Sequence, residues 1–170
     1  MALYRIYNGP APTTASQAAV ATGTAIKTLL QVQASATLNF KIKAWGISFD
    51  GSAAATPGIV ECVETDVAAT SLTAHVAAGI HKIDAAALSG GDPTTNLIQV
   101  GTSNTGYTAG AEGSITATRM FDAQHIAPTN QYIFQWPLGQ EPVVQISKFA
   151  RIRVKFGTTV NAICWMDIEI

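Results

Sequence analysis

Charged side chains are scarce in this sequence. Asp, Glu, Lys and Arg make up 12% of its 170 residues, about half of the ~25% that is typical of soluble proteins. The formal net charge is −1, so the sequence lacks the basic surplus expected of a nucleic-acid binder or of a protein held on an anionic membrane. Since surfaces buried in interfaces are also poor in charge, the composition favours a subunit of an assembly.

Cysteine and histidine are equally few, and none of them has the spacing of a metal or catalytic site. Cys62 and Cys164 each lie among apolar residues, so we interpret them as buried free thiols. His75, His81 and His125 are isolated and form neither an HxH nor an HExxH pair. The sequence also contains no GxGxxG, GxxxxGK[ST] or GxSxG motif. We therefore expect no metal, no cofactor and no catalytic residues.

Long apolar runs are absent as well. No stretch approaches the ~20 residues of a membrane-spanning helix, and residues 1–5 lack the basic and apolar regions of a signal peptide. We therefore expect no membrane partner, and synthesis and folding in a cytoplasm.

What the sequence does contain is a series of short alternating segments. The clearest is 38–49, LNFKIKAWGISF, whose first half alternates apolar and polar side chains as a half-buried strand does. The apolar phase shifts by one residue at Ala44, and Trp45 and Ile47 carry it onward, which predicts a β-bulge near Gly46. Residues 24–33 also alternate, and a short loop allows them to pair antiparallel with 38–49. Further strands are expected at 3–7, 59–67, 97–100, 114–126, 132–136, 143–156 with a kink around Ser147, and 161–170.

Eight or nine such strands, with turn signals between them and no regular alternation with helices, predict one all-β domain over residues 1–170. The expected fold is an antiparallel β-sandwich, specifically a jelly roll of about eight strands. Residues 68–80 are interpreted as an irregular or short helical crossover, and 81–93 as a loop anchored by Ile83 and Leu88. Residues 8–23 form an N-terminal arm, with a low-complexity linker as the open alternative.

Two groups of charged residues are candidates for a functional role. Arg151, Arg153 and Lys155 would share one face of a strand, which we interpret as a solvated sheet face, with a patch facing an acidic partner as the alternative. A hydrolase with paired carboxylates could use several acidic residues, but solvated or capping roles explain them more simply. These candidates are Glu61, Glu64, Asp66, Asp167 and Glu169.

The aromatic residues allow two interpretations. Exposed Trp and Tyr side chains could stack on sugar rings, whereas packing in the core or between subunits needs no ligand. We expect packed or intersubunit anchors at Trp136 with Tyr132, and at Trp165 with Trp45. Tyr107 stands alone in a glycine-rich segment.

Several stretches carry a resemblance to small virion proteins of tailed bacteriophages. They include LYRIYNG at residues 3–9, the arm PTTASQAAVATGTAIKTLLQV, IKAWGISFDG, ECVETDVAAT, GYTAGAEG, TATRMFDAQHIAP and ISKFARIRV. Such proteins resemble trimeric jelly rolls of the tumour-necrosis-factor type that sit on capsids as decoration or cement proteins. The resemblance implies a homotrimer that binds the major capsid protein on the outside of the virion and stabilises the shell.

The resemblance also gives the arm an expected role. We expect Pro12, Thr13, Thr14 and Gln17 to contact the shell or an adjacent subunit. Two other functions stay open: a tail-associated or receptor-binding module that recognises a glycan, and a sandwich-type hydrolase or cupin-like enzyme.

Overall fold

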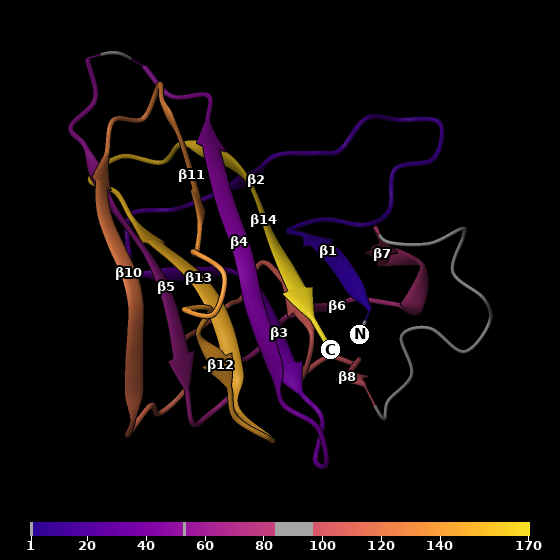
Figure 1. Ribbon diagram of the computed structural model, residues 1–170. Coiled ribbons are helices and arrows are strands. Elements are labelled where there is room, and N and C mark those ends of the chain that lie inside the picture. The colour runs from indigo at the N-terminus through magenta and orange to yellow at the C-terminus, as the bar shows by residue number, and fades with distance from the viewer. Residues whose placement is uncertain (1, 53, 84–96) are drawn as a thin grey trace.

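The computed structural model describes residues 2–52, 54–83 and 97–170 as a nearly all-β protein (Figure 1). Leu88, the expected loop anchor, lies outside the described residues. The strands are β1 (Leu3–Tyr7), β2 (Val20–Ala21), β3 (Lys27–Ala34), β4 (Phe40–Phe49), β5 (Gly58–Thr65), β6 (Thr73–Ala74), β7 (Ile80–Lys82), β8 (Ile98–Gln99), β9 (Gly106–Tyr107), β10 (Thr118–Ile126), β11 (Gln131–Gln135), β12 (Val143–Val144), β13 (Phe149–Lys155) and β14 (Asn161–Glu169). One short 3-10 helix, η1, covers Ala77–Gly79, and the described part of the chain has no helix long and apolar enough to cross a membrane.

The strands form two antiparallel sheets. Sheet A has the order β11-β4-β14-β1-β7, with β12 beside β4 and β2 beside β14, and sheet B has the order β10-β5-β13-β3-β9-β6, with β8 beside β3. When the eight strands of five or more residues are numbered along the chain, sheet A contains 6-3-8-1 and sheet B contains 5-4-7-2. The chain thus changes sheet at nearly every connection, which is the order of a jelly roll. The predicted fold class is confirmed.

The core lies between the two sheets and follows from the alternation in the sequence. Tyr4 and Ile6 of β1 point inward and are fully buried, as are Cys164 of β14 and Cys62 of β5. Both cysteines are free thiols, and burial raises their pKa values, so they act as small core hydrophobes.

Strand β4 has the predicted bulge, but at a different residue. In its pairing with β14, Asp167 lies opposite Ala44 and Ile168 lies opposite Ile42, so Lys43 is the additional residue. The predicted position near Gly46 was therefore wrong. The bulge turns Lys43 toward the solvent side of sheet A, where its ammonium group is paired with Glu141.

The predicted pairing of residues 24–33 with 38–49 was also wrong. Strand β3 belongs to sheet B, between β13 and β9, whereas β4 belongs to sheet A. The short connection at residues 35–39 crosses from one sheet to the other. Each strand can then turn its apolar face to the common core, which a flat hairpin of the two would not achieve.

Two loops cover the outer face of sheet B. Ala109 donates its backbone N–H to the Thr28 carbonyl, and Ala69 donates its backbone N–H to the Gln31 side chain. These loops bury Arg151 completely, so the expectation of a solvated face was wrong for this residue. Arg153 is largely buried beside Glu61, and only Lys155 is exposed.

Candidate assembly surface

The outer face of sheet A presents aromatic and aliphatic side chains to solvent beside internally paired charges. Arg5 and Tyr7 of β1, Ile163 and Trp165 of β14, and Ile133 of β11 alternate with inward-facing residues of the same strands. Ile133 is 59% exposed, and the other four are half-buried. Exposed apolar side chains gathered on one sheet face are typical of an interaction surface.

Trp165 lies at the centre of this face in a fixed position. Its register partner is Gly46, and a Cβ atom at Gly46 would lie 2.7 Å from the indole ring. The Arg5 guanidinium carbon also lies 4.1 Å from the ring centroid. Contacts with the β4 backbone and with a cation therefore hold the indole in place, which lowers the conformational entropy lost when another protein binds it.

The charges beside Trp165 are paired within the chain. Arg5 donates two hydrogen bonds to Asp167, both of 2.7 Å, and this pair raises the pKa of Arg5. Lys43 forms ion pairs with Glu141 and with Glu169, and its hydrogen bond lowers the pKa of Glu141 to about 2. Because these charges already have partners, another protein could cover the face without leaving them unpaired.

The four aromatic residues proposed as anchors occupy different places. Trp45 is fully buried and lies on the opposite face of sheet A from Trp165, so it is the packed kind of anchor, not an interface residue, and the expected pairing with Trp165 was wrong. Tyr132 packs on Trp45, with ring centroids 5.3 Å apart, and donates its hydroxyl to Asp122 of the other sheet. Trp136 is half-buried and packs against the core cluster, with its ring centroid 5.1 Å from that of Phe134. Only Trp165 lies on the outer face.

The N-terminal arm is a loop tied to β14 at both ends. Asn8 donates to the Ala162 carbonyl and accepts from the Cys164 amide, and β2 pairs with the start of β14. Between these anchors the arm extends away from both sheets (Figure 1). Loops of this shape, with their ends close together, are often functional.

The proposed shell contacts lie in this loop. Pro12, Thr13 and Thr14 are exposed, whereas Gln17 is half-buried and its side chain packs on Gly9. Pro12 and Gln17 also border an open hollow of about 510 Å³ on the outer face of sheet A.

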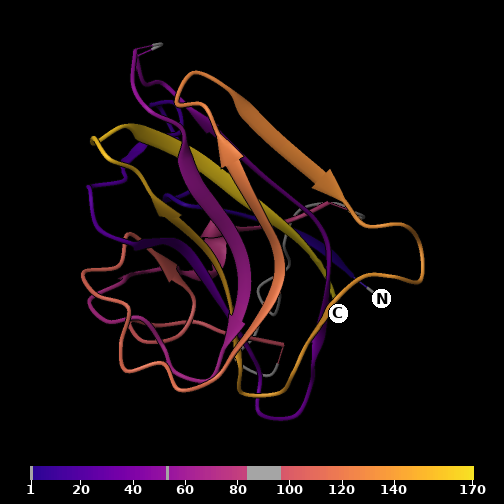
Figure 2. The ribbon, with the colours of Figure 1, turned by 90° about the vertical axis from the view of Figure 1, so that its left-hand side faces the viewer.

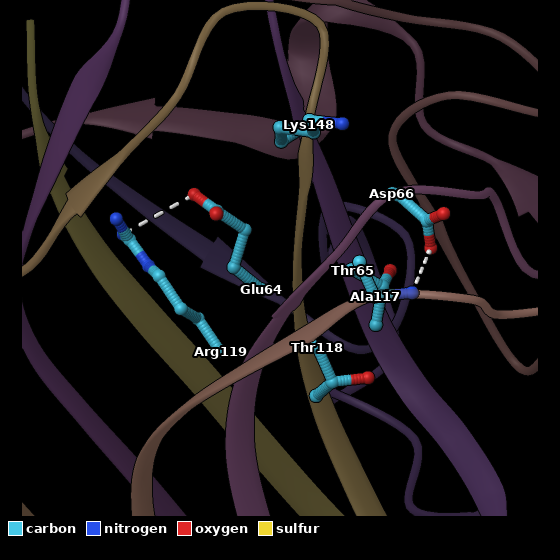
Figure 3. Close-up of a pocket in the computed structure, with 7 residues that line it drawn as sticks. All are labelled: Glu64, Thr65, Asp66, Ala117, Thr118, Arg119 and Lys148. Carbon is cyan, nitrogen blue, oxygen red and sulfur yellow. Dashed lines mark hydrogen bonds and ion pairs between the residues drawn. The ribbon is translucent and has the colours of Figure 1, made fainter.

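Each candidate catalytic carboxylate has a structural partner. Glu64 accepts a hydrogen bond from the Gln145 amide at 2.8 Å and pairs with Arg119, whereas Asp66 accepts from the Thr116 hydroxyl and the Ala117 amide. These hydrogen bonds, led by that from Thr116, lower the pKa of Asp66 to about 2. Figure 3 shows the two carboxylates turned apart around a small pocket of about 170 Å³.

The remaining candidates are also paired. Glu61 binds Arg153 at 2.7 Å, Asp167 binds Arg5 and Glu169 binds Lys43. His75 is buried and its Nε2 lies 2.8 Å from the Tyr7 carbonyl oxygen. Within the described ranges, no three His, Cys, Asp or Glu side chains gather in a way that could hold a metal ion.

Comparison with protein-family models, with curated proteins and with solved structures gives no significant match to this chain. The sequence identified Trp165 as a possible anchor, but it indicated Asp167 only as a candidate catalytic carboxylate and Gly46 only as the position of a bulge, and it did not indicate Arg5. A glycine inside an otherwise apolar strand was the one available signal, since it often marks a close approach.

Substitution of Gly46 by Ala tests how closely the indole packs on β4. We expect Gly46→Ala to lower the free energy of unfolding by about 1–3 kcal/mol, because the added methyl group overlaps the Trp165 ring. The measurement is urea denaturation. Gly157→Ala is the matched control, since a Cβ atom there would have no described atom within 4 Å. Equal effects of the two changes would contradict the packing.

Proposed function

We propose that this chain is a structural protein of a bacteriophage virion, a decoration or cement protein that binds the outside of the capsid as a homotrimer. The observation that carries the proposal is the apolar outer face of sheet A, with Ile133 exposed and the neighbouring charges paired internally. The resemblance of the sequence to phage decoration proteins supports the same function.

A cement protein needs interface area and repetition rather than chemistry. Each copy adds a modest contact, and a shell multiplies that contact many times, so weak individual binding gives strong overall stabilisation. The low charge of the chain and the pairing of its candidate catalytic carboxylates agree with a passive role. In this proposal its partners are further copies of itself and the major capsid protein, and its location is the virion surface.

The glycan-binding alternative has less support. Stacking on a sugar needs a free aromatic face, but the Trp165 ring is already in contact with Gly46 and with the Arg5 guanidinium group. Trp45 is buried. A hydrolase would need a carboxylate that is free to act as acid or base, whereas Glu64 and Asp66 are both held by hydrogen bonds.

The first test is the solution mass together with binding to shells. We expect light scattering on a sizing column to give about three times 17.8 kDa, unchanged by a chelator. We also expect the purified protein to sediment with capsids that lack it and to raise their temperature of disruption. Failure to bind such capsids, with a glycan array giving clear signals instead, would overturn the proposal in favour of a receptor-binding module.

A further inference from the structure

The turn that links β11 to β12 holds a leucine in solvent. Leu138 is 92% exposed, the highest value among the large hydrophobic side chains of the described residues. Figure 2 shows the orange segment between β11 and β12 standing away from the sandwich. A large apolar side chain in this position contributes little to folding, so it needs another explanation.

The turn itself is firmly built. Gln140 donates its backbone N–H to the Pro137 carbonyl at 3.0 Å, and Gly139 has a φ of 86°, which together define a type II turn with Leu138 at its second position. The Gly139 amide donates to Glu141 at 2.8 Å. Since Glu141 also binds Lys43, the turn is fixed over the outer face of sheet A. Such preorganisation is typical of a binding anchor.

The opposite edge of the same face contains the hollow of about 510 Å³. Its floor is formed by Tyr7 and Ile163, which point outward from β1 and β14, and its walls include Pro12 of the arm and Ile83 after β7. The polar residues Arg5, Gln17, His81 and Lys82 complete the lining, and Arg5 is already paired with Asp167. Most of the surface inside the hollow is nevertheless apolar, and the hollow is wide enough to receive a leucine side chain.

We propose that Leu138 of one copy of this chain enters the hollow of a second copy. The inference rests on the proposed homotrimer and identifies the contact that would build it. Both surfaces belong to the outer face of sheet A, one at the β11–β12 edge and the other at the β1–β7 edge. Because the two surfaces differ, the contact is heterologous, and repetition closes a ring when the rotation between copies is one third of a turn.

Charge favours a second copy as the occupant. The turn residues 137–140 carry no charge, and Arg5, Asp167 and Lys43 are already paired within the chain. Lys82, the other cation that lines the hollow, also has an interaction within the chain. Packing one copy on another therefore buries apolar surface without isolating a charge, whereas a strongly charged partner would find no unpaired counterpart among these groups.

The first experiment compares the solution masses of the whole chain and of two variants. We expect Leu138→Lys to reduce the mass threefold, to that of one subunit, because an ammonium group in the hollow would lose its hydration and would lie among the cations Arg5 and Lys82. Met120→Lys is the matched control: Met120 is 52% exposed but lies on β10 of sheet B, and this variant should keep the wild-type mass. A Leu138→Lys protein with the wild-type mass would overturn the proposal.

A second experiment maps the contact directly. The double variant Leu138→Cys and Pro12→Cys, treated with a short bismaleimide, should give covalently linked species up to the full ring, whereas each single variant should not. The native cysteines are buried and should not react. Absence of linked species overturns the contact. If the chain is a monomer that still binds capsids, the contact and the trimer are both wrong, while the capsid-binding role stands. If the chain is a linked trimer that binds no capsid, the contact stands and the capsid-binding role is wrong.

Discussion

Replacement of Glu112 by Ala is expected to lower the free energy of unfolding by about 3–5 kcal/mol, the usual cost of removing one partner of a buried ion pair. The reason is Arg151, whose side chain is 0% exposed. Glu112 Oε2 lies 3.2 Å from the arginine Nη1 and is the carboxylate with which this guanidinium is paired. Burial already lowers the pKa of Arg151, and Glu112 opposes that shift.

Glu112 also accepts hydrogen bonds from strand β3 at the same site. Its carboxylate accepts hydrogen bonds from both the backbone N–H and the hydroxyl of Thr28, at 2.5 and 2.7 Å. The variant thus leaves an unpaired cation and unpaired donors beneath the loops that cover sheet B. Each unsatisfied buried group adds its own desolvation cost.

The control for this prediction is Glu61→Ala, which breaks the neighbouring pair with Arg153. The Arg153 side chain is 11% exposed and can reach water, so we expect a loss of about 1 kcal/mol. Adding Arg151→Met to Glu112→Ala should recover most of the loss, because no charge then stays buried. Chemical denaturation of all four proteins is the measurement, and equal losses for the two Glu variants would contradict the argument.

Arg151 also shows what alternation in a sequence can and cannot predict. The pattern in FARIRVK correctly separated Ile152 and Val154, on the core side, from the arginines. It could not show that the other side is covered, because the cover comes from loops 39 and 84 residues away in the sequence. Burial of a charged face is a long-range property.

The fold class, in contrast, was predictable because it depends on local features of the sequence. Period-two alternation and turn residues are local, so eight long strands and the two-layer sandwich follow from short windows of sequence. Strand order is different, because residues 35–39 fit either a hairpin or a crossing between sheets. Only the requirement that β3 and β4 both face one core decides it.

The candidate surface was only partly predictable. Trp165 could be named as a possible anchor. Whether Trp45 lies on the inner or the outer face of sheet A, however, depends on the bulge at Lys43, and the sequence predicted that bulge three residues later. Leu138 gave no periodic signal, since one leucine in a Pro-Leu-Gly turn is too short a pattern. Its exposure is visible only once the turn is closed by Glu141.

Trp45 gives the second large effect, because it is the largest of the fully buried side chains. We expect Trp45→Ala to lower the free energy of unfolding by about 3–5 kcal/mol, through lost apolar burial and the cavity left beside Tyr132. The indole N–H has no hydrogen-bond partner among the residues that the structure describes. Trp45→Phe should therefore cost less, because it keeps an aromatic ring in the core and also removes an unpaired donor.

Trp165→Ala, on the opposite face of the same sheet, tests whether Trp45 alone of these two tryptophans is a core residue. Trp165 is half-buried, so its removal from an isolated chain should cost only about 1–2 kcal/mol in urea denaturation. A Trp165 variant as unstable as Trp45→Ala would mean that both indoles are core residues and would weaken the case for an assembly surface. If instead Trp165→Ala is mildly destabilised yet loses the oligomeric mass, the two faces of sheet A have separate roles: one folds the subunit and the other joins it to its neighbours.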